Sequence, residues 1–227
     1  MASRNREDAV LVIGLGRFGG TLAQTLQELG HRVVAVDRNH DLVQQWSGQI
    51  THVIEADATS EVVMRQLGAH EFRRAVVAIG TEIEASVLAT GVLLDLAVPE
   101  VWSKAITREH GRILERIGAN HVVYPERDAG ERVAHLMTGR LIDFLEFDDN
   151  YAIAKLRAPR EICGRALEKT ALRSRFGITI VGVKHPGGQF THAEAGTVLG
   201  PGDLIMIAGG TDRVEEFATA VGTANPP

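Results

Sequence analysis

The sequence is poor in the residues that build covalent cross-links and metal centres. Its 227 residues include a single cysteine, Cys163, which excludes an internal disulfide and a cysteine metal cluster. The nine histidines are scattered, and none forms an HxH or HxxxH pair. We therefore expect no disulfide framework and no zinc site, and we expect Cys163 to be a small buried or half-buried residue.

Long apolar runs and an excess of basic charge are also lacking. No apolar run approaches the ~18 residues that a membrane-spanning helix needs. The net charge is −5, whereas a general nucleic-acid binder carries a basic face. The first residues contain no hydrophobic signal region. These absences predict a cytoplasmic protein that does not bind nucleic acid.

The sequence does contain a glycine-rich turn between two apolar segments. The first segment leads into Gly14-Leu-Gly16-Arg-Phe-Gly19, a GxGxxG pattern, and the second ends before Asp37. This order, with an acid about 20 residues after the turn, is typical of dinucleotide-binding folds. Gly14 permits the tight turn, Gly16 lets the backbone approach a phosphate, and Gly19 lets the helix pack on the strand. The alternative is a turn whose glycines serve packing alone.

The residues beside this turn indicate the kind of ligand. Asp37 stands where a carboxylate accepts hydrogen bonds from ribose hydroxyls and repels a 2′-phosphate. We therefore expect ATP, ADP or NAD rather than NADP. A guanidinium at Arg17, directly at the turn, can contact a phosphate chain in a bidentate manner. This favours ATP, although NAD-binding proteins also carry arginine here at times. The neighbouring Phe18 and Arg38 are included among the candidate binding residues.

Strand and helix patterns alternate through the first 125 residues. Mostly apolar strands alternating with helices predict a parallel sheet covered on both faces, and hence a six-stranded Rossmann-like α/β domain. Glycines just past helix ends suit the left-handed cap conformation: Gly30, Gly48, Gly68 and Gly118. The expected strands are 9–13, 32–36, 52–55, 74–79, 100–104 and 121–124, and the expected helices are 17–29, 40–47, 60–67, 83–96 and 108–117.

Further candidate binding residues follow the predicted strand ends, where the ligand crevice of an open α/β sheet lies. Asp57 is placed to meet an adenine edge; its alternative role is to cap the helix that begins near Ser60. Gly80 lets backbone lie close to a ligand, and Lys104 is suited to a phosphate or a carbonyl. The set at these ends is Asp57, Ala58, Thr59, Ile79, Gly80 and Lys104.

A long helix is predicted where the alternation stops. From Glu126 to about Phe147, apolar residues recur at spacings of three and four, which is typical of an amphipathic helix. Its apolar face either packs on its own domain or crosses over to a second subunit. Glu126 itself either supplies favourable charge at the helix N-terminus or holds a divalent cation, Mg²⁺ or Ca²⁺, near nucleotide phosphates.

The remaining residues predict a separate small α+β domain. We expect strands at 151–156, 177–184 and 204–208 and helices at 161–172 and 212–220. The domains are therefore 1–148, a nucleotide-binding domain with the long helix, and 149–227. A hydride-transfer enzyme needs a substrate domain that places an acid or base at the nicotinamide. The second domain is small and follows the whole sheet, so binding without catalysis fits better.

Several segments together carry a resemblance to a known family. The chain resembles the RCK (regulator of potassium conductance) proteins over residues 7–220, specifically the gating subunits of Ktr/Trk-type potassium uptake systems (the KtrA/TrkA group). The matching segments are 12–20, 36–37, 56–59, 77–80, Glu84-Ala-Ser86, 104–105, 114–120, 124–128, 164–167 and 199–203. Glu84 joins the candidate binding residues on this ground.

The resemblance implies a function and an assembly. Such subunits dimerise through the crossover helix and form an octameric ring attached to a membrane potassium-translocating subunit of the KtrB/TrkH kind, at the inner face of the cell membrane. ATP and ADP change the shape of the ring and so gate the pore.

The resemblance also implies roles for particular residues. Arg17 would meet the terminal phosphate, Asp37 the ribose, and Asp57 with Thr59 the adenine. Glu126 would hold a divalent cation between the two sites of a dimer. Some members bind cyclic di-AMP in the second domain, here around Arg173, Ile178 and His185.

Two other functions remain open from the sequence. The first is a regulatory subunit of the Trk type that senses NAD or NADH. The second is an enzyme, either a small NAD-dependent oxidoreductase or a methyltransferase that uses S-adenosylmethionine.

Overall fold

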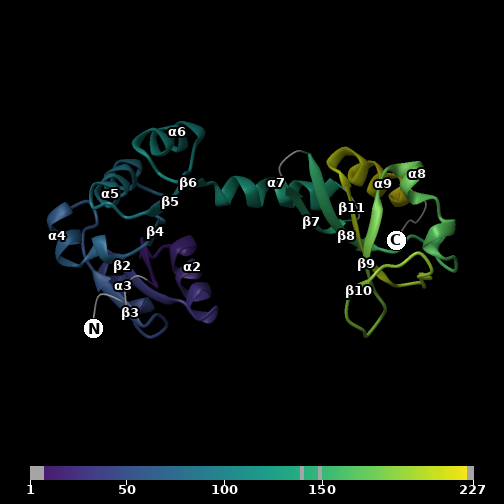
Figure 1. The fold of residues 1–227 in the computed structure, drawn as a ribbon, viewed down its shortest axis with the longest axis horizontal. Helices are drawn as coiled ribbons and strands as arrows, with labels where there is room; N and C mark the ends of the chain where they lie inside the picture. The colour runs from purple at the N-terminus through teal and green to yellow at the C-terminus, as the bar shows by residue number, and fades with distance from the viewer. Residues whose placement is uncertain (1–7, 139–140, 148–149, 224–227) are drawn as a thin grey trace. The chain divides into compact units, whose positions relative to one another are not determined.

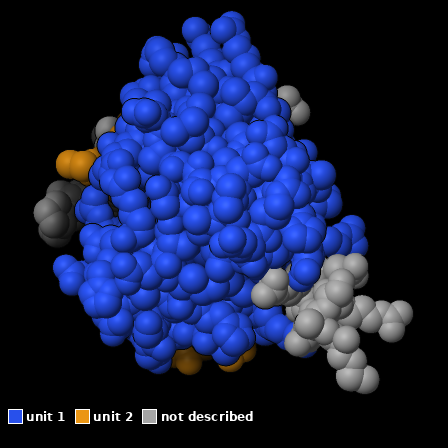
Figure 2. All heavy atoms as spheres, turned by 90° about the vertical axis from the view of Figure 1, so that its left-hand side faces the viewer, with its two compact units in different colours: residues 1–126 blue, residues 127–227 orange. Residues whose placement is uncertain are grey.

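The chain divides into two compact units, residues 1–126 and residues 127–227. The structure, a computed structural model, describes residues 8–138, 141–147 and 150–223. Figure 1 traces their helices and strands, and Figure 2 shows one face of the molecule with the first unit in blue. Each unit has its own sheet and its own hydrophobic core.

The first unit is built on a parallel sheet whose strand order reverses at its centre. The order is β3-β2-β1-β4-β5-β6, and every neighbouring pair is parallel. This confirms the predicted six-stranded Rossmann-like domain. The reversal falls between β1 and β4, where ligand crevices form beyond the carboxyl ends of the strands. The strands are β1 (Ala9–Ile13), β2 (Arg32–Asp37), β3 (His52–Glu55), β4 (Arg74–Val77), β5 (Glu100–Lys104) and β6 (His121–Val123).

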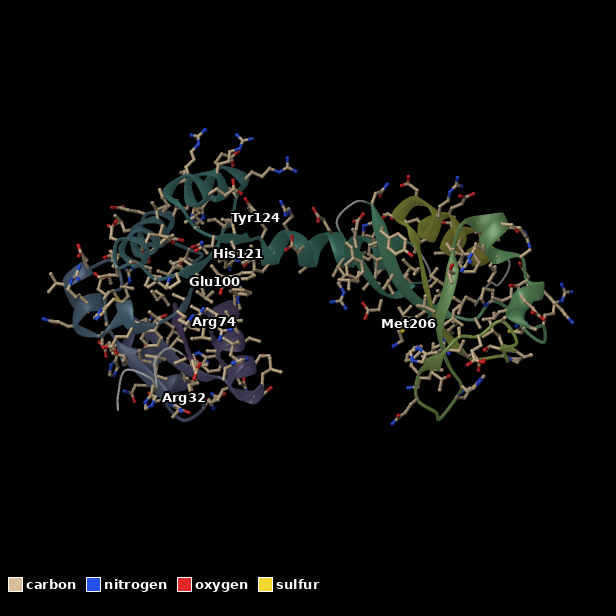
Figure 3. All side chains as sticks on the ribbon, in the orientation of Figure 1. Arg32, Arg74, Glu100, His121, Tyr124 and Met206 are labelled. Atoms are coloured by element: carbon tan, nitrogen blue, oxygen red, sulfur yellow. The ribbon has the colours of Figure 1, made fainter. Side chains whose placement is uncertain are left out.

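The opposite ends of these strands are marked by labelled side chains in Figure 3. Arg32, Arg74, Glu100 and His121 are the first residues of β2, β4, β5 and β6. They therefore lie at the amino ends of the parallel strands, away from the edge at which a crevice is expected.

Both faces of this sheet are covered. All five residues of β1 are buried. Because successive strand side chains point to opposite faces, Leu11 and Ile13 join one hydrophobic cluster and Val10 and Val12 join another. The covering elements are α2 (Arg17–Glu28), α3 (His40–Trp46), α4 (Glu61–Gln66), η1 (Ala69–Glu71), α5 (Ile83–Asp95) and α6 (Arg108–Ile117).

The helix ends confirm three of the four predicted glycine caps. Gly30, Gly68 and Gly118 have φ of +87°, +74° and +108°, in the left-handed region. The prediction for Gly48 was wrong, because this residue is not among the described glycines with positive φ. The preceding Ser47 keeps a right-handed helical conformation, so the chain leaves α3 without a left-handed residue at that point.

The second unit is an antiparallel sheet with short helices, which confirms the predicted small α+β domain. The strands pair in the order β10-β9-β11-β8-β7. The half-buried Cys163 is a free thiol, as expected, and partial burial raises its pKa. The elements are α7 (Pro125–Thr138), which begins in the first unit, β7 (Leu141–Phe147), β8 (Tyr151–Arg157), η2 (Arg160–Ile162), η3 (Leu167–Lys169), α8 (Leu172–Phe176), β9 (Thr179–Lys184), β10 (Thr191–His192), β11 (Leu204–Gly210) and α9 (Thr211–Thr223).

The predicted helix from Glu126 to Phe147 was wrong in its second half. Helix α7 ends at Thr138, and residues 141–147 form β7, which pairs with β8. The register shifts between Leu141 and Asp143, which is the signature of a β-bulge. The bulge lets Leu141 and Phe144 both face the core, 8% and 2% exposed, although they are three residues apart. This spacing imitates a helix. The domain boundary expected between residues 148 and 149 stays a prediction.

The predicted helix at 161–172 was also wrong. The segment contains only the short turns η2 and η3, and α8 begins at Leu172. Two residues inside it have left-handed backbone, Gly164 with φ +75° and Ala171 with φ +54°. A left-handed residue interrupts the helical hydrogen-bond pattern, so the apolar spacing of this segment does not produce a helix. The two-residue strand β10 was not predicted.

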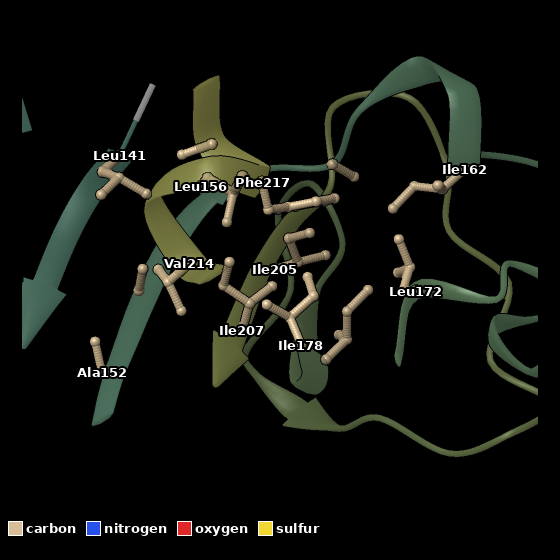
Figure 4. Close-up of a cluster of buried hydrophobic side chains, with 14 of the residues drawn as sticks. Leu141, Ala152, Leu156, Ile162, Leu172, Ile178, Ile205, Ile207, Val214 and Phe217 are labelled. Carbon is tan, nitrogen blue, oxygen red and sulfur yellow. The ribbon is translucent and has the colours of Figure 1, made fainter. Parts of the chain in front are cut away.

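The core of the second unit gathers on one side of its sheet, beneath α9. Figure 4 shows Phe217 of α9 among Leu156, Ile205 and other buried side chains of the strands. The Phe217 ring is fully buried and meets the edge of Phe176 at a centroid distance of 5.2 Å.

Replacing this ring tests the core. Phe217→Ala should lower the free energy of unfolding of the second unit by about 3–5 kcal/mol, because it removes a fully buried aromatic side chain. Native-state amide hydrogen exchange of β11 reports this unit directly. Leu145→Ala on β7 is the control, because Leu145 is 56% exposed, and it should cost much less. Equal losses for the two variants would contradict the described core.

Candidate functional site

A crevice of about 680 Å³ lies at the carboxyl ends of the parallel strands, where the strand order reverses. Each wall is a loop that follows a strand: the glycine-rich turn after β1, and the segments after β2, β3, β4 and β5. Its lining contains most of the predicted site residues: Gly14, Gly16, Arg17, Phe18, Asp37, Arg38, Asp57, Ala58, Thr59, Ile79, Gly80, Lys104 and Glu126.

The three motif glycines occupy three different environments. Gly14 has φ +94°, which only glycine adopts readily, and its N–H donates to the carbonyl of Val36 at 2.8 Å. A Cβ on Gly19 would stand 1.8 Å from the Gly14 carbonyl oxygen, so Gly19 allows the close approach of α2. A Cβ on Gly16 would meet nothing within 4 Å. Gly16 is the N-cap of α2 without a side-chain cap, so the first amides of α2 are left to a ligand.

Asp37 is held by the backbone of two loops. Its Oδ2 accepts the Leu15 N–H at 2.6 Å, and its Oδ1 accepts the Asn39 N–H at 2.8 Å. A carboxylate offers about four lone-pair positions, so each oxygen retains capacity for a further donor. The carboxylate is thus oriented at the crevice wall, with room for the hydroxyl groups of a ribose.

Asp57 and Thr59 form a compact polar turn after β3. Asp57 Oδ1 accepts the Thr59 N–H at 2.9 Å and the Thr59 hydroxyl at 2.7 Å. These hydrogen bonds hold the pKa of Asp57 below its usual value. The cap of α4 is Ser60, whose hydroxyl accepts the Val63 N–H. The helix-cap role considered for Asp57 is therefore filled by another residue.

Lys104 is a buried cation at the end of β5. The residue is 7% exposed, and its Nζ donates to Glu126 Oε1 at 2.5 Å. Its Nζ also lies 5.6 Å from the centroid of the Phe18 ring, within cation–π range. A Cβ on Gly80 would come within 2.9 Å of this Nζ. Gly80 therefore makes the space that the ammonium group occupies.

Glu126 interacts with two cations, Lys104 at the end of β5 and Arg17 in the glycine-rich turn. The hydrogen bond from Lys104 lowers the pKa of Glu126, and the positive charge of Arg17 adds to the effect. Arg17 is exposed, and its guanidinium makes no hydrogen bond or ion pair with a side chain in the described part of the chain. In the described part of the chain, no group of three or more His, Cys, Asp or Glu is arranged to hold a metal ion. The cation-binding role of Glu126 stays a prediction.

Two predicted site residues lie outside the lining, and other lining residues were not predicted. Gly19 acts through packing, and Glu84 is exposed on the first turn of α5. The unpredicted polar members of the lining are Asn39, Thr81 and Glu82, and the apolar ones include Leu42 and Ile106. Asn39 carried a usable signal, because an asparagine immediately before a helix is a common N-cap, and it caps α3.

The comparisons with known proteins agree with this architecture. The family model of the TrkA-N domain matches residues 10–125, and that of the TrkA-C domain matches residues 151–222. Ktr system potassium uptake protein A of Bacillus subtilis (strain 168) is 34% identical over 215 residues, which are 94% of this chain and 96% of that protein.

Solved structures share the fold. The GsuK RCK domain has a TM-score of 0.66 at 22% identity, covering 97% of this chain and 48% of that chain. The GsuK channel bound to NAD has a TM-score of 0.64 at 21% identity, covering 97% of this chain and 40% of that chain. This chain thus spans less than half of either structure.

A Rossmann-like parallel sheet followed by an antiparallel C-terminal domain is the architecture of an RCK protein. The chain belongs to the Ktr/Trk family of potassium uptake proteins, which carry TrkA-N and TrkA-C domains. This confirms the resemblance seen in the sequence. Within residues 8–138, 141–147 and 150–223, no helix has both the length and the apolar character that a membrane crossing requires.

The glycine environments predict unequal effects of added methyl groups. Gly19→Ala should destabilise the first unit by about 1–3 kcal/mol, because the new Cβ collides with backbone. Gly16→Ala should change folding stability by less than about 0.5 kcal/mol, because its Cβ points into open space. Denaturant unfolding followed by tryptophan fluorescence measures both variants, and a larger loss for Gly16→Ala would refute the described packing.

The hydrogen-bond partners of the two acids predict a reciprocal pair of pKa changes. Lys104→Met should raise the pKa of Glu126 and leave the pKa of Asp57 unchanged. Thr59→Val should raise the pKa of Asp57 and leave the pKa of Glu126 unchanged. Because both pKa values are lowered in the folded protein, each interaction stabilises the fold near neutral pH and is lost as the pH falls through that pKa. Side-chain carbon NMR titration measures both groups, and a variant that moves the other acid instead would count against the assignment.

Proposed function

We propose that this chain is a nucleotide-sensing regulatory subunit of a Ktr-type potassium uptake system. It binds ATP or ADP in the crevice of its first unit and has no catalytic activity of its own. It acts at the cytoplasmic face of the membrane, attached to a potassium-translocating membrane subunit of the KtrB/TrkH kind. The observation that carries the proposal is the pairing, in one crevice, of an oriented carboxylate, Asp37, with a cationic end at Arg17 and Lys104.

The adenosine end of the ligand is assigned to the loops after β2 and β3. Asp37 is fixed by two backbone N–H groups and keeps lone pairs for the ribose hydroxyls. The Asp57–Thr59 turn lies in the same lining and supplies polar groups for an adenine edge. Ala58 is buried beside it, 6% exposed, and adds an apolar surface.

The phosphate end is assigned to the glycine-rich turn. The uncapped N-terminus of α2 offers N–H groups and partial positive charge. Arg17 is exposed and suited to a terminal phosphate, because a guanidinium binds phosphate oxygens in a bidentate manner. Glu126 is 63% exposed in its side chain while paired to Lys104, so one of its oxygens remains accessible to a divalent cation such as Mg²⁺ or Ca²⁺.

The assembly proposed is a homodimer through α7 that builds a homo-octameric ring. Two apolar side chains of α7 support contact with a second subunit, because Val133 is 51% exposed and Met137 is 81% exposed. Exposed apolar residues on one helix favour the crossover role over packing within one chain. Each nucleotide, ATP or ADP, shifts the ring between two shapes only to the extent that it binds one shape more tightly than the other.

NAD or NADH is the second candidate ligand. The GsuK channel with the same fold has been solved bound to NAD, and the crevice motif suits either nucleotide. Cyclic di-AMP is a further candidate for the second unit. A cavity of about 540 Å³ there is lined by residues that include Arg173 and Ile178, whereas His185 lies outside that lining and bonds to Asp203.

Calorimetry with ATP, ADP, NAD, NADH and S-adenosylmethionine, with and without Mg²⁺ or Ca²⁺, tests the proposal. Tight ATP and ADP binding, with ATP tightened by the divalent ion and recovered unchanged, is expected. A preference for NADH without metal dependence would favour the redox-sensing candidate. Binding of S-adenosylmethionine alone would overturn the proposal.

Arg17→Ala tests the role of the guanidinium. The variant should weaken ATP binding about tenfold and leave ADP binding nearly unchanged, because ADP lacks the phosphate that Arg17 contacts. The matched control is Arg65→Ala, which removes an exposed arginine on α4, paired with Glu61 and outside the crevice lining. An equal loss of ATP and ADP affinity in Arg17→Ala would count against this role.

A further inference from the structure

An ion pair joins two of the loops that line the crevice. Arg38 follows β2, and Glu82 is the N-cap residue of α5, after β4. The Arg38 guanidinium donates to a carboxylate oxygen of Glu82, and both residues line the crevice. The side chains are 58% and 48% exposed, so the pair stands at the solvent side of the site.

The place of Arg38 gives this pair a chemical consequence. Asp37 precedes it and is the carboxylate suited to ribose hydroxyls. In dinucleotide-binding folds, an arginine near this position accommodates the 2′-phosphate of a phosphorylated ribose. The same two residues therefore combine an acid that disfavours a 2′-phosphate with a base that attracts one. The partner of the Arg38 guanidinium therefore decides whether this part of the site repels or attracts a 2′-phosphate.

We propose that Glu82 is a specificity residue that makes this site reject 2′-phosphorylated adenosine nucleotides. It engages the guanidinium of Arg38 and adds its own negative charge beside the ribose position. The inference rests on the proposed adenosine-nucleotide function and extends it, because it assigns part of the discrimination to a residue on a different strand end from Asp37.

The local charges support this role for Glu82. Asp37 and Asp57 are the acids of the adenosine end, and the charge of Arg38 contributes to the low pKa of Asp57. Arg38 therefore lies close to the adenosine end. Asp37 also receives two backbone N–H groups, which offset part of its charge. Without Glu82, an unpaired guanidinium would meet a 2′-phosphate with charge-assisted hydrogen bonds.

The test compares the binding of 5′-AMP with that of adenosine 2′,5′-bisphosphate by calorimetry at low salt. Wild type should strongly prefer 5′-AMP. Glu82→Gln should raise the affinity for the bisphosphate about five-fold and leave the affinity for 5′-AMP close to that of wild type. This is the scale expected for the loss of one exposed ion pair and one repulsive charge. This gain in affinity for the bisphosphate should shrink as the salt concentration is raised, because Arg38 and Glu82 are exposed.

Two further variants make the result specific. Glu61→Gln is the matched control, since it removes the carboxylate of another exposed Arg–Glu pair, 50% exposed and outside the crevice lining. It should keep the wild-type preference. The double variant Arg38→Ala with Glu82→Gln should not show the increased affinity for the bisphosphate, because it lacks the guanidinium that would bind the 2′-phosphate.

Each outcome has a distinct meaning. An unchanged preference in Glu82→Gln, an equal change in Glu61→Gln, or a gain that survives removal of Arg38 would overturn the inference and leave the proposed function standing. If wild type binds ATP and ADP but neither 5′-AMP nor the bisphosphate, the inference fails alone. If it binds none of the four nucleotides, the proposed adenosine-nucleotide function fails, and the inference fails with it.

Discussion

The carboxylate of Asp37 is the contact on which the crevice depends. It accepts the N–H of Leu15 from the first strand–helix loop and the N–H of Asn39 from the turn before α3. One side chain thus fixes the glycine-rich turn against the neighbouring strand. Asp37 also lines the crevice, so in the proposed function the order of this loop and ribose recognition are not independent. A substitution at Asp37 would loosen the turn as well as remove the contact proposed to the ribose.

The cationic end of the crevice, at Lys104, depends on Gly80 having no side chain. Lys104 is buried, and an uncompensated buried ammonium is costly. The structure compensates it with Glu126 and with the face of Phe18, and Gly80 leaves the space in which the ammonium sits. Because a phosphate can replace a carboxylate as the partner of an ammonium, this arrangement suits exchange between an internal acid and an anionic ligand.

Local patterns predicted the parts of the structure that depend on neighbours in sequence. The strands of the first sheet, the glycine-rich turn and Asp37 all follow from short motifs with a physical reason. The failures have tertiary causes. The bulge in β7 placed Leu141 and Phe144 on one face and imitated helical spacing. Glu82 was missed because its partner Arg38 lies 44 residues away, a proximity that no local pattern records.

Helix α7 carries the ion pair at Glu126 at the boundary between the two units. The helix runs from Pro125 to Thr138; its first two residues belong to the first unit, Glu126 lines the crevice, and the residues from Arg127 on belong to the second unit. At 1.5 Å per residue it is a rod of roughly 20 Å. The partner of the buried Lys104 ammonium is therefore the last residue before the boundary between the two units.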